Sequence, residues 1–282
     1  MQTLVDSHVH FWQPARLRYD WLATVPAINH AYTPELLTQK QGDINLQQIV
    51  FVQAECVPGQ GIDEVAWVSE LAQTEPRLGG IVAFAPLEHG KEQTQGWLER
   101  LMAFPLVKGV RRLLQSEPVG FARQPDFVAG VRLLPQFGYS FDICITYPQM
   151  ADAVWLVAQC PEVQFVLDHL GKPGIAAGLW EPWATEMARL AALPNVWCKL
   201  SGLVTEADHV NWQPADLQPY IDHALATFGA ERLMFGGDWP VSELATTYVG
   251  WWETAVSALS HLSATEQHQI FYENGRSFYR LG

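Results

Sequence analysis

The feature that most constrains the fold is a series of short apolar runs spread along the whole 282-residue chain. Each run is rich in Val, Ile, Leu and Phe, and their starts lie 25 to 44 residues apart. That spacing accommodates one strand, one helix and two loops, repeated along the chain. The eight runs, predicted as strands, span residues 4–11, 48–56, 79–87, 107–114, 139–146, 164–171, 196–203 and 232–240.

The segments between the runs have the periodicity of helices. In segment 61–75, the apolar residues Val65, Val68 and Leu71 recur at helical spacing. Near-continuous apolar strands that alternate with helices indicate a parallel sheet covered by those helices. Two further helices are predicted over residues 148–160, with Pro148 in the first turn, and over residues 247–262.

Eight strand–helix units in a chain of this length predict an α/β fold, a closed (β/α)₈ barrel formed by residues 1–282 as a single domain. The main alternative is a doubly wound open sheet. Such sheets often carry a glycine-rich phosphate turn, and neither G-x-G-x-x-G nor G-x-x-x-x-G-K-[ST] occurs here. The longest stretch without a predicted strand or helix, residues 12–45, is interpreted as a long functional loop.

The charge balance and the cysteines restrict partners and compartment. Lys and Arg number 17 against 30 Asp and Glu, a net charge of −13, which disfavours binding to nucleic acid or to an anionic membrane. No apolar stretch reaches the roughly 20 residues of a membrane span, and no leader-like segment precedes the first run. We expect a cytoplasmic protein with a small-molecule substrate. Its dispersed cysteines predict no cysteine-based zinc site: Cys56, Cys144, Cys160 and Cys198.

Histidine and aspartate residues lie at the carboxyl ends of the predicted strands, where barrel enzymes have their active sites. The first run carries His8 and His10, and residues two apart on a strand face the same side. Two imidazoles on one face can bind one divalent ion, or both can polarise one carbonyl. The sixth run adds His169 and the eighth adds Asp238. In a barrel these four side chains converge on one mouth, and they are the predicted catalytic residues.

Further polar and aromatic residues lie near the same predicted strand ends. Arg111 and Arg112 alternate across the sheet, so at most one of them faces the barrel interior. Trp12 and Trp239 directly follow the two key motifs, and an indole face can pack on the C–H face of a sugar ring. The other tryptophans are expected mainly to pack helices on the barrel. The predicted substrate-binding residues are Trp12, Gln53, Glu55, Arg112, Lys199 and Trp239.

Four segments resemble the amidohydrolase superfamily. They read VDSHVHFW at 5–12, LDHLGKP at 167–173, KLSGL at 199–203 and FGGDWPV at 235–241. More narrowly, the chain is similar to the branch of barrel hydrolases that contains sugar-acid lactonases, those of L-fucono- and L-rhamnonolactone among them, and dicarboxylate lactonases. The resemblance implies a (β/α)₈ barrel, hydrolytic chemistry and often one or two divalent metals at the mouth.

The chain departs from the two-metal pattern of that superfamily in two places. Two-metal members use a carboxylated lysine on the fourth strand, whereas Lys108 lies at the start of the fourth run here. Many members also use a histidine on the fifth strand, and run 139–146 contains none. The resemblance therefore implies one divalent cation, zinc by preference, although lactonases of this branch that work without metal leave metal-free catalysis open. The implied ligands are His8, His10 and Asp238, with His169 or Glu55 as a fourth.

The predicted reaction is the opening of the cyclic ester of a small lactone. Asp238 acts as general base on a water molecule, and Lys199 faces the new carboxylate. The oxyanion is stabilised by His169, by the histidine pair, by a bound cation or by Arg112. The few arginines near the mouth favour a neutral sugar lactone over a dicarboxylate one. Decarboxylation, amide hydrolysis by a metal-dependent amidohydrolase, and a non-catalytic binding protein are the alternatives.

Overall fold

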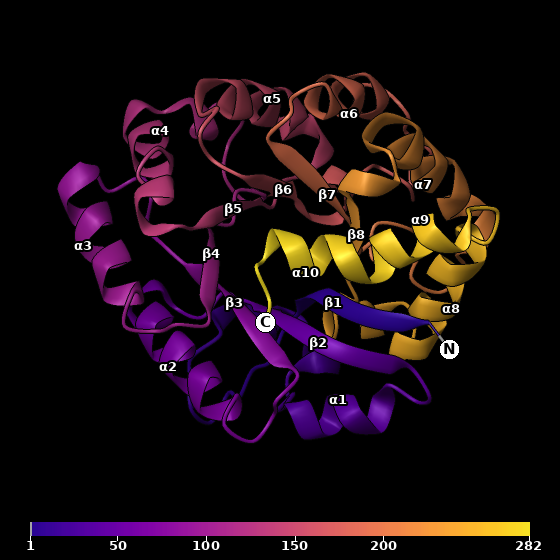
Figure 1. Ribbon diagram of the computed structural model, residues 1–282, viewed down its shortest axis with the longest axis horizontal. Coiled ribbons are helices and arrows are strands. Elements are labelled where there is room, and N and C mark those ends of the chain that lie inside the picture. Colours follow the sequence, from indigo (N-terminus) through magenta and orange to yellow (C-terminus); the bar gives the residue numbers. More distant parts are fainter. Residues whose placement is uncertain (1) are drawn as a thin grey trace.

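The computed structural model describes residues 2–282, and its strands form one parallel sheet that curves into a barrel (Figure 1). Each strand pairs in parallel with the next one along the chain. The predicted (β/α)₈ barrel is therefore confirmed. The strands are β1 (Thr3–Val9), β2 (Asn45–Val52), β3 (Leu78–Phe84), β4 (Val107–Arg111), β5 (Ser140–Ile143), β6 (Phe165–Leu167), β7 (Val196–Leu200) and β8 (Leu233–Phe235).

Helices surround the strands, and most connect one strand to the next (Figure 1). The three predicted helices are present as α2, α5 and α8, and Pro148 lies in a 3₁₀ turn just before α5. The helices are α1 (Pro34–Lys40), α2 (Gly61–Leu71), α3 (Lys91–Leu101), α4 (Pro125–Val131), α5 (Met150–Gln159), α6 (Trp183–Ala191), α7 (Pro214–Phe228), α8 (Tyr248–Ala258), α9 (Ala264–His268) and α10 (Asn274–Phe278).

The strands are apolar on both faces, and alternate residues serve two separate cores. On β2, Ile49 and Phe51 belong to the large core between barrel and helices. Val50 and Val52 belong instead to a small core that includes residues of other strands and of the C-terminal segment. This alternation follows from the two-residue period of a strand. It explains why the runs read as continuously apolar.

The C-terminal segment closes the amino-terminal end of the barrel. Phe278, Tyr279 and Leu281 join the small interior core of valines. In Figure 1, α10 crosses the centre of the barrel and the chain ends beside it. With this end filled by apolar side chains, a small molecule has to approach from the opposite end, where the strands finish.

The seam between β1 and β8 brings two distant motifs into register. The amide of Asp238 donates to the carbonyl of His8 at 2.8 Å, and the amide of His10 donates to the carbonyl of Trp239 at 2.7 Å. The Asp6 carboxylate also accepts from the Gly237 amide, at 2.8 Å. These bonds hold His8, and His10 just after β1, beside the turn that follows β8.

The ends of the predicted strands and the long predicted loop both differ from the structure. Each strand ends several residues before the predicted end of its run, because the chain leaves the sheet there to present polar side chains. Glu55 and Asp238, for example, both have a left-handed backbone, with φ of 59° and 51°. The long loop 12–45 is also less irregular than predicted, since it contains α1 and two 3₁₀ turns.

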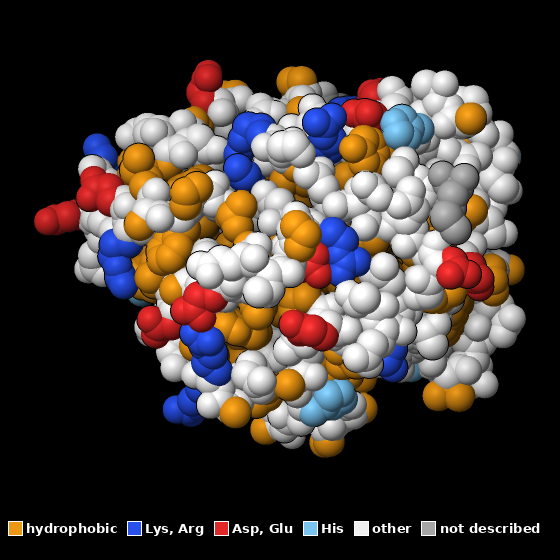
Figure 2. Space-filling model, turned by 60° about the horizontal axis from the view of Figure 1, so that its bottom comes forward, with side chains coloured by type: hydrophobic (Ala, Val, Ile, Leu, Met, Phe, Trp, Pro, Cys, Tyr) orange, Lys and Arg blue, Asp and Glu red, His pale blue; other side chains and the backbone are white. Residues whose placement is uncertain are grey.

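No helix within residues 2–282 combines the length and apolar character needed to cross a bilayer. All four cysteines are buried and none forms a disulfide with another. On the face seen in Figure 2, Lys and Arg side chains are interspersed with Asp and Glu, and its described residues form no continuous basic patch.

A buried carboxyl group on α2 makes stability depend on pH. Burial raises the pKa of Glu64 to about 8, although the Ala54 amide and the Tyr19 hydroxyl bond its Oε1. Its ordinary value is 4.5, so between these values the folded chain keeps a proton that the unfolded chain releases. Stability is therefore lost as pH rises through this window, by up to about 1.4 kcal/mol per pH unit, and the loss levels off above pH 8.

We expect Glu64→Gln to remove this dependence. The free energy of unfolding, measured in urea at pH 5.5 and at pH 8, should fall less with pH in the variant than in the parent protein. Glu70→Gln is the matched control, because Glu70 lies on the same helix with a side chain 56% exposed. Parallel pH profiles for parent and Glu64→Gln would contradict an elevated pKa at Glu64.

Candidate active site

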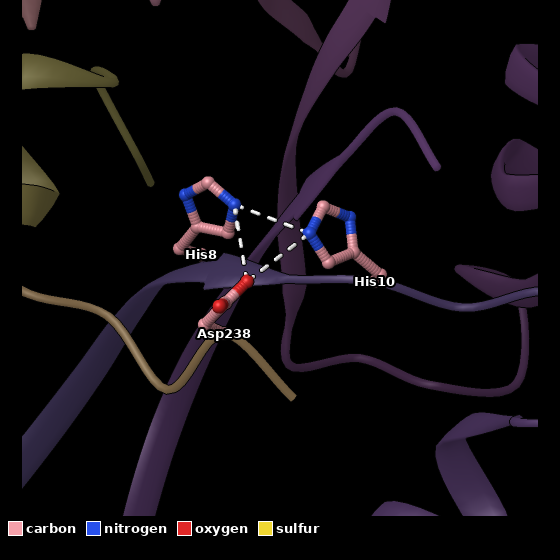
Figure 3. A group of neighbouring side chains, drawn as sticks. All are labelled: His8, His10 and Asp238. Atoms are coloured by element: carbon pink, nitrogen blue, oxygen red, sulfur yellow. Dashed lines mark hydrogen bonds and ion pairs between the residues drawn. The ribbon is translucent and has the colours of Figure 1, made fainter. Parts of the chain in front are cut away.

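Three side chains meet at the carboxyl end of the barrel seam, and we call them the His–Asp cluster: His8, His10 and Asp238 (Figure 3). His8 lies on β1, His10 follows its last residue, and the aspartate comes from the turn after β8. The Nε2 atoms of His8 and His10 lie 3.2 Å apart. Oδ1 of Asp238 lies 3.7 Å from Nε2 of His8 and 3.4 Å from Nε2 of His10. All three side chains are buried.

The turn that carries Asp238 depends on its two preceding glycines. A Cβ on Gly236 would come within 2.7 Å of the Cβ of His8, a contact that real side chains do not make. A Cβ on Gly237 would collide with the Asp6 carboxylate and the Tyr248 ring. The Gly-Gly pair therefore allows the backbone of β8 to approach the histidine strand closely, and it places Asp238 against both imidazoles.

Hydrogen bonds behind the cluster orient its rings. Nδ1 of His10 donates to the carbonyl of Val52 at 2.7 Å, which fixes the ring with its Nε2 toward the cluster. Nδ1 of His8 lies 3.3 Å from Oδ1 of Asp168. Carbonyl and carboxylate partners of this kind commonly stand behind histidines that bind metals.

The donor atoms of the His–Asp cluster suit one divalent cation. Two imidazole nitrogens and one carboxylate oxygen are a familiar ligand set for catalytic zinc, which leaves a fourth position for water. Around a tetrahedral zinc with ligand bonds of about 2.0–2.1 Å, neighbouring ligand atoms lie roughly 3.3 Å apart. The three separations in the cluster, 3.2, 3.4 and 3.7 Å, are close to that spacing.

A second group of potential ligands shares a histidine with the cluster. It consists of His8, Asp168 and His169. Asp168 is already paired with two cations, because Nζ of Lys199 lies 3.0 Å from its Oδ1 and Nη1 of Arg111 lies 3.2 Å from its Oδ2. A carboxylate neutralised in this way is a poor ligand for a second ion, so the geometry favours a single cation.

Burial and neighbouring charges set the protonation of the mouth residues. Burial lowers the pKa of His8 and of His169 well below the ordinary value, so both rings are neutral near pH 7. Burial acts to raise the pKa of Asp238, but the neighbouring His169 and His10 outweigh it and the pKa is lowered. The Asp238 carboxylate is therefore ionised and able to accept a proton.

A network of charges fills the barrel interior below the cluster. Lys199 lies at its centre, with Nζ 2.6 Å from Oδ2 of Asp142 and 3.2 Å from Nδ1 of His8. The Tyr279 hydroxyl donates to the same Asp142 oxygen at 2.6 Å. All four side chains are fully buried. The network thus extends from the C-terminal segment to the His–Asp cluster.

A cavity of about 260 Å³ opens above the cluster. Its wall contains carboxylates, cations, neutral polar groups and two indole rings, so it can contact both the apolar and the polar parts of a small molecule. The residues that line it are His10, Trp12, Trp21, Ala54, Glu55, Arg111, Leu113, Gln115, Ser116, Cys144, His169, Lys172, Asp238 and Val241.

A family model described as Amidohydrolase matches residues 5–281. The chain belongs to the amidohydrolase family. This amidohydrolase is 34% identical over 297 residues to L-fucono-1,5-lactonase of Burkholderia multivorans, across 98% of this chain and 96% of the relative. It is 29% identical over 286 residues to L-fucono-1,5-lactonase of Burkholderia ambifaria, across 98% and 95% of the two chains. A crystal structure of a Burkholderia multivorans amidohydrolase with bound Zn matches with a TM-score of 0.85 and 33% identity, across 99% of this chain and 100% of the other.

The structure brings together the four catalytic residues predicted for this amidohydrolase. His169 joins the His–Asp cluster from the turn after β6, with its Nε2 3.9 Å from Oδ1 of Asp238 and its Nδ1 2.9 Å from Oγ of Ser201. Glu55 lines the cavity, but it belongs to neither group of potential metal ligands found among residues 2–282. It is therefore better placed to meet a substrate than a metal.

Only one of the two adjacent arginines faces the interior, as predicted, but the choice of Arg112 as the substrate-binding one was wrong. Arg111 faces the interior, where its Nη2 donates to the carbonyl of Gln53 at 2.6 Å. Arg112 points away from the cavity and pairs with Glu88 and Glu117 at 2.8 and 2.5 Å. The two arginines do alternate across the sheet, but partners outside the strands decide which of them faces inward: Asp168 for Arg111, and Glu88 with Glu117 for Arg112.

Three other substrate-binding predictions differ from the structure. Lys199 lies below the cavity floor with no exposed surface, held by Asp142 and Asp168. Trp239 packs behind the wall, where its Nε1 donates to Glu243 at 2.9 Å. Gln53 is 1% exposed and bonds Glu55 rather than facing the opening. All three support residues of the site from behind.

Sequence reasoning missed several residues of the cavity wall. Lys172 follows His169 in the LDHLGKP segment, so its position in the motif was a usable signal. Trp21 lies in the long loop after β1 and meets Trp12 edge to face, with ring centres 5.2 Å apart. Gln115 and Ser116 follow β4, in a stretch that carries no distinctive pattern. Their place in the wall depends on tertiary contacts alone.

Proposed function

We propose that this amidohydrolase hydrolyses the cyclic ester of a neutral sugar lactone to the corresponding hydroxy acid. The observation that carries the proposal is the convergence of a buried, ionised Asp238 with three imidazoles at the floor of a small polar and aromatic cavity. The family match and the lactonase relatives support a hydrolase that acts on ester bonds. That the ester belongs to a neutral sugar lactone is a further step of the proposal, beyond the hydrolysis of ester bonds.

Asp238 is the proposed general base. Its ionised carboxylate accepts a proton from the attacking water, whose oxygen then adds to the lactone carbonyl. The tetrahedral intermediate collapses with cleavage of the ring C–O bond, and Asp238 returns the proton to the leaving alkoxide. The neutral His169 lies beside the same carboxylate oxygen, 3.9 Å away, where it can orient the water or the carbonyl.

Arg111 is the proposed partner of the developing oxyanion. It lines the cavity, and its Nε is buried without a hydrogen-bond partner among residues 2–282. A buried donor of this kind costs free energy until a ligand satisfies it. The fixed charge of the guanidinium, held by Asp168 and by the carbonyl of Gln53, costs no reorganisation when negative charge forms on the substrate.

The His–Asp cluster would hold one divalent cation in the proposed enzyme. When bound, such an ion lowers the pKa of a coordinated water and polarises a carbonyl. The solved Burkholderia multivorans amidohydrolase with bound Zn supports zinc as the ion of choice. The chain itself contributes the buried, oriented imidazoles and a carboxylate that accepts the proton.

The aromatic side of the cavity supports a sugar as substrate. Trp12 and Trp21 both line it, from the segment that follows β1. Trp12 is anchored by Nε1 bonds to the carbonyls of Ile28 and His30, at 3.2 and 2.8 Å. Trp12 is itself fully buried and supports the half-buried ring of Trp21. Trp21 thus offers an apolar contact for the C–H groups of a sugar ring, while the polar wall can bind its hydroxyls.

A lactone panel tests the proposal. Purified protein, in weak buffer with a pH indicator, should release acid from neutral sugar lactones such as L-fuconolactone faster than spontaneous opening. Aromatic and enoic acids are included, with carbon dioxide release as the readout for decarboxylation. Failure to release acid from any lactone at neutral pH would overturn the proposed function, and carbon dioxide release would replace it with decarboxylation.

Metal removal should abolish most of this activity. Dialysis against a chelator is expected to remove the ion from the His–Asp cluster, and lactone hydrolysis should fall by at least about 10²-fold, since the ion activates the water. Added Zn²⁺ should restore the activity, with metal content measured in every sample. Full activity in metal-free protein would show instead that the histidines polarise the carbonyl without a metal.

A further inference from the structure

Backbone strain marks four residues of the cavity wall. Within residues 2–282, six residues other than glycine have a positive φ, and four of these line the cavity: Glu55, His169, Lys172 and Asp238. L-residues adopt this conformation at a cost in free energy, and such strain gathers at functional sites. His169 and Asp238 belong to the proposed catalytic group. Glu55 and Lys172 share both features with them and have no role in the mechanism above.

Local bonds fix the orientation of the Glu55 carboxylate. Gln53 holds Glu55 at two points, since its Oε1 accepts from the Glu55 amide at 2.7 Å and its Nε2 donates to Oε2 at 3.0 Å. The preceding residue is fixed as well, because the Ala54 amide donates to buried Glu64 at 3.2 Å. A carboxylate held this firmly at a cavity wall is prepared for directional hydrogen bonds.

The charges around the cavity leave Glu55 without a cation of its own. Lys172 has a carboxylate partner, with its Nζ 3.6 Å from Oε1 of Glu206. Arg111 is paired with Asp168. Among residues 2–282, no Lys, Arg or His nitrogen lies within ion-pair distance of the Glu55 carboxylate, and only its Oε2 has a hydrogen-bond partner. Glu55 is half-buried at the cavity wall, so water or a molecule bound in the cavity supplies the donors to Oε1.

We propose that Glu55 is a specificity-determining residue that accepts hydrogen bonds from ring hydroxyls of the substrate. Because a carboxylate can only accept hydrogen bonds, it favours a lactone rich in hydroxyl donors. The same negative charge disfavours a lactone that carries its own carboxylate. This inference rests on the proposed lactonase function and assigns its preference for neutral sugar lactones to one side chain.

The test compares Glu55→Gln with the parent enzyme on three lactones. They are L-fuconolactone, or whichever neutral sugar lactone the panel selects, γ-butyrolactone, which has no hydroxyls, and D-glucarolactone, which carries a carboxylate. Glu55→Gln should lower kcat/KM for the sugar lactone at least about tenfold and change γ-butyrolactone less than about twofold. The preference for the sugar lactone over D-glucarolactone should shrink. Where γ-butyrolactone reacts too slowly, its inhibition constant against the sugar lactone replaces kcat/KM.

Two controls separate specificity from other effects. Glu70→Gln makes the same chemical change on the exposed face of α2 and should leave all three lactones unaffected. Metal content should be equal in Glu55→Gln and the parent enzyme, since Glu55 is not a ligand here. An equal loss on the sugar lactone and γ-butyrolactone, or an unchanged preference between the sugar lactone and D-glucarolactone, would overturn this inference alone. Absence of lactone hydrolysis in the parent enzyme would overturn the proposed function first.

Discussion

Replacing Asp238 with Asn is expected to lower kcat for lactone hydrolysis by about 10²–10⁴-fold, the range that general acid–base groups contribute. The amide has nearly the same shape, but it cannot accept the proton of the attacking water. The turn itself should survive, because the two bonds that hold it across the β1–β8 seam join main-chain atoms: the Asp238 amide donates to the His8 carbonyl, and the His10 amide donates to the Trp239 carbonyl. Steady-state rates on the lactone that the panel selects measure the effect.

The control for this prediction has to separate base chemistry from metal binding. Asp238 also belongs to the His–Asp cluster, so the rates are compared in saturating Zn²⁺ with metal content determined for each protein. Asp222→Asn makes the same change at an exposed position of α7 and should have full activity. Asp238→Asn protein that binds metal and retains more than about a tenth of the parent rate would rule out Asp238 as the essential base.

The sequence alone predicts where the strands lie, but not how the chain runs at their carboxyl ends. The β-branched runs and their spacing predict all eight strands, because burial on both faces demands continuously apolar segments. At residues such as Glu55 and Asp238 the same runs continue while the chain leaves the sheet with a positive φ. At Asp238 that conformation is held by a partner distant in the sequence, the carbonyl of His8, which no local pattern reveals. At Glu55 the partner is local, since Gln53 lies only two residues before it.

The alternation of side chains along a strand predicts whether two residues face the same side, but not whether that side is the barrel interior. It places His8 and His10 on the same side, and the structure brings both into the His–Asp cluster. It cannot tell which of Arg111 and Arg112 faces inward, since that depends on Asp168 in the interior and Glu88 outside. The partners lie on other elements, so the answer requires the three-dimensional packing.

Adjacency in sequence was likewise a poor guide to adjacency in the cavity. Trp239 follows Asp238 directly, yet the left-handed turn at Asp238 sends the indole behind the wall, 5.2 Å from the ring of Tyr32. Trp12 does line the cavity, because the chain runs outward from β1 without such a turn. The sugar contact that we propose is therefore made by Trp21, with the buried Trp12 packed against it.

The sequence does not reveal that Lys199 is buried between two carboxylates. Replacing this lysine with Met is expected to have the largest effect on the free energy of unfolding. The lysine neutralises two fully buried carboxylates, with Nζ 2.6 Å from Asp142 and 3.0 Å from Asp168. Removing one partner of a buried ion pair typically costs about 3–5 kcal/mol, because the remaining charge is left without compensation. Urea unfolding near pH 7 should show a loss of this size, against at most about 1 kcal/mol for Lys40→Met, whose side chain is 49% exposed.

The origin of this loss can be tested through Asp142. Adding Asp142→Asn to the Lys199→Met protein removes the uncompensated carboxylate, so part of the lost stability should return. Burial already raises the pKa of Asp142 to about 6, against the opposing charge of Lys199. Without the lysine the pKa rises further, and folding takes up a proton over a wider pH range. The deficit relative to the parent protein should therefore be smaller at pH 5 than at pH 8. A deficit that is independent of pH, with no recovery in the double variant, would mean that Lys199 contributes through packing rather than through its charge.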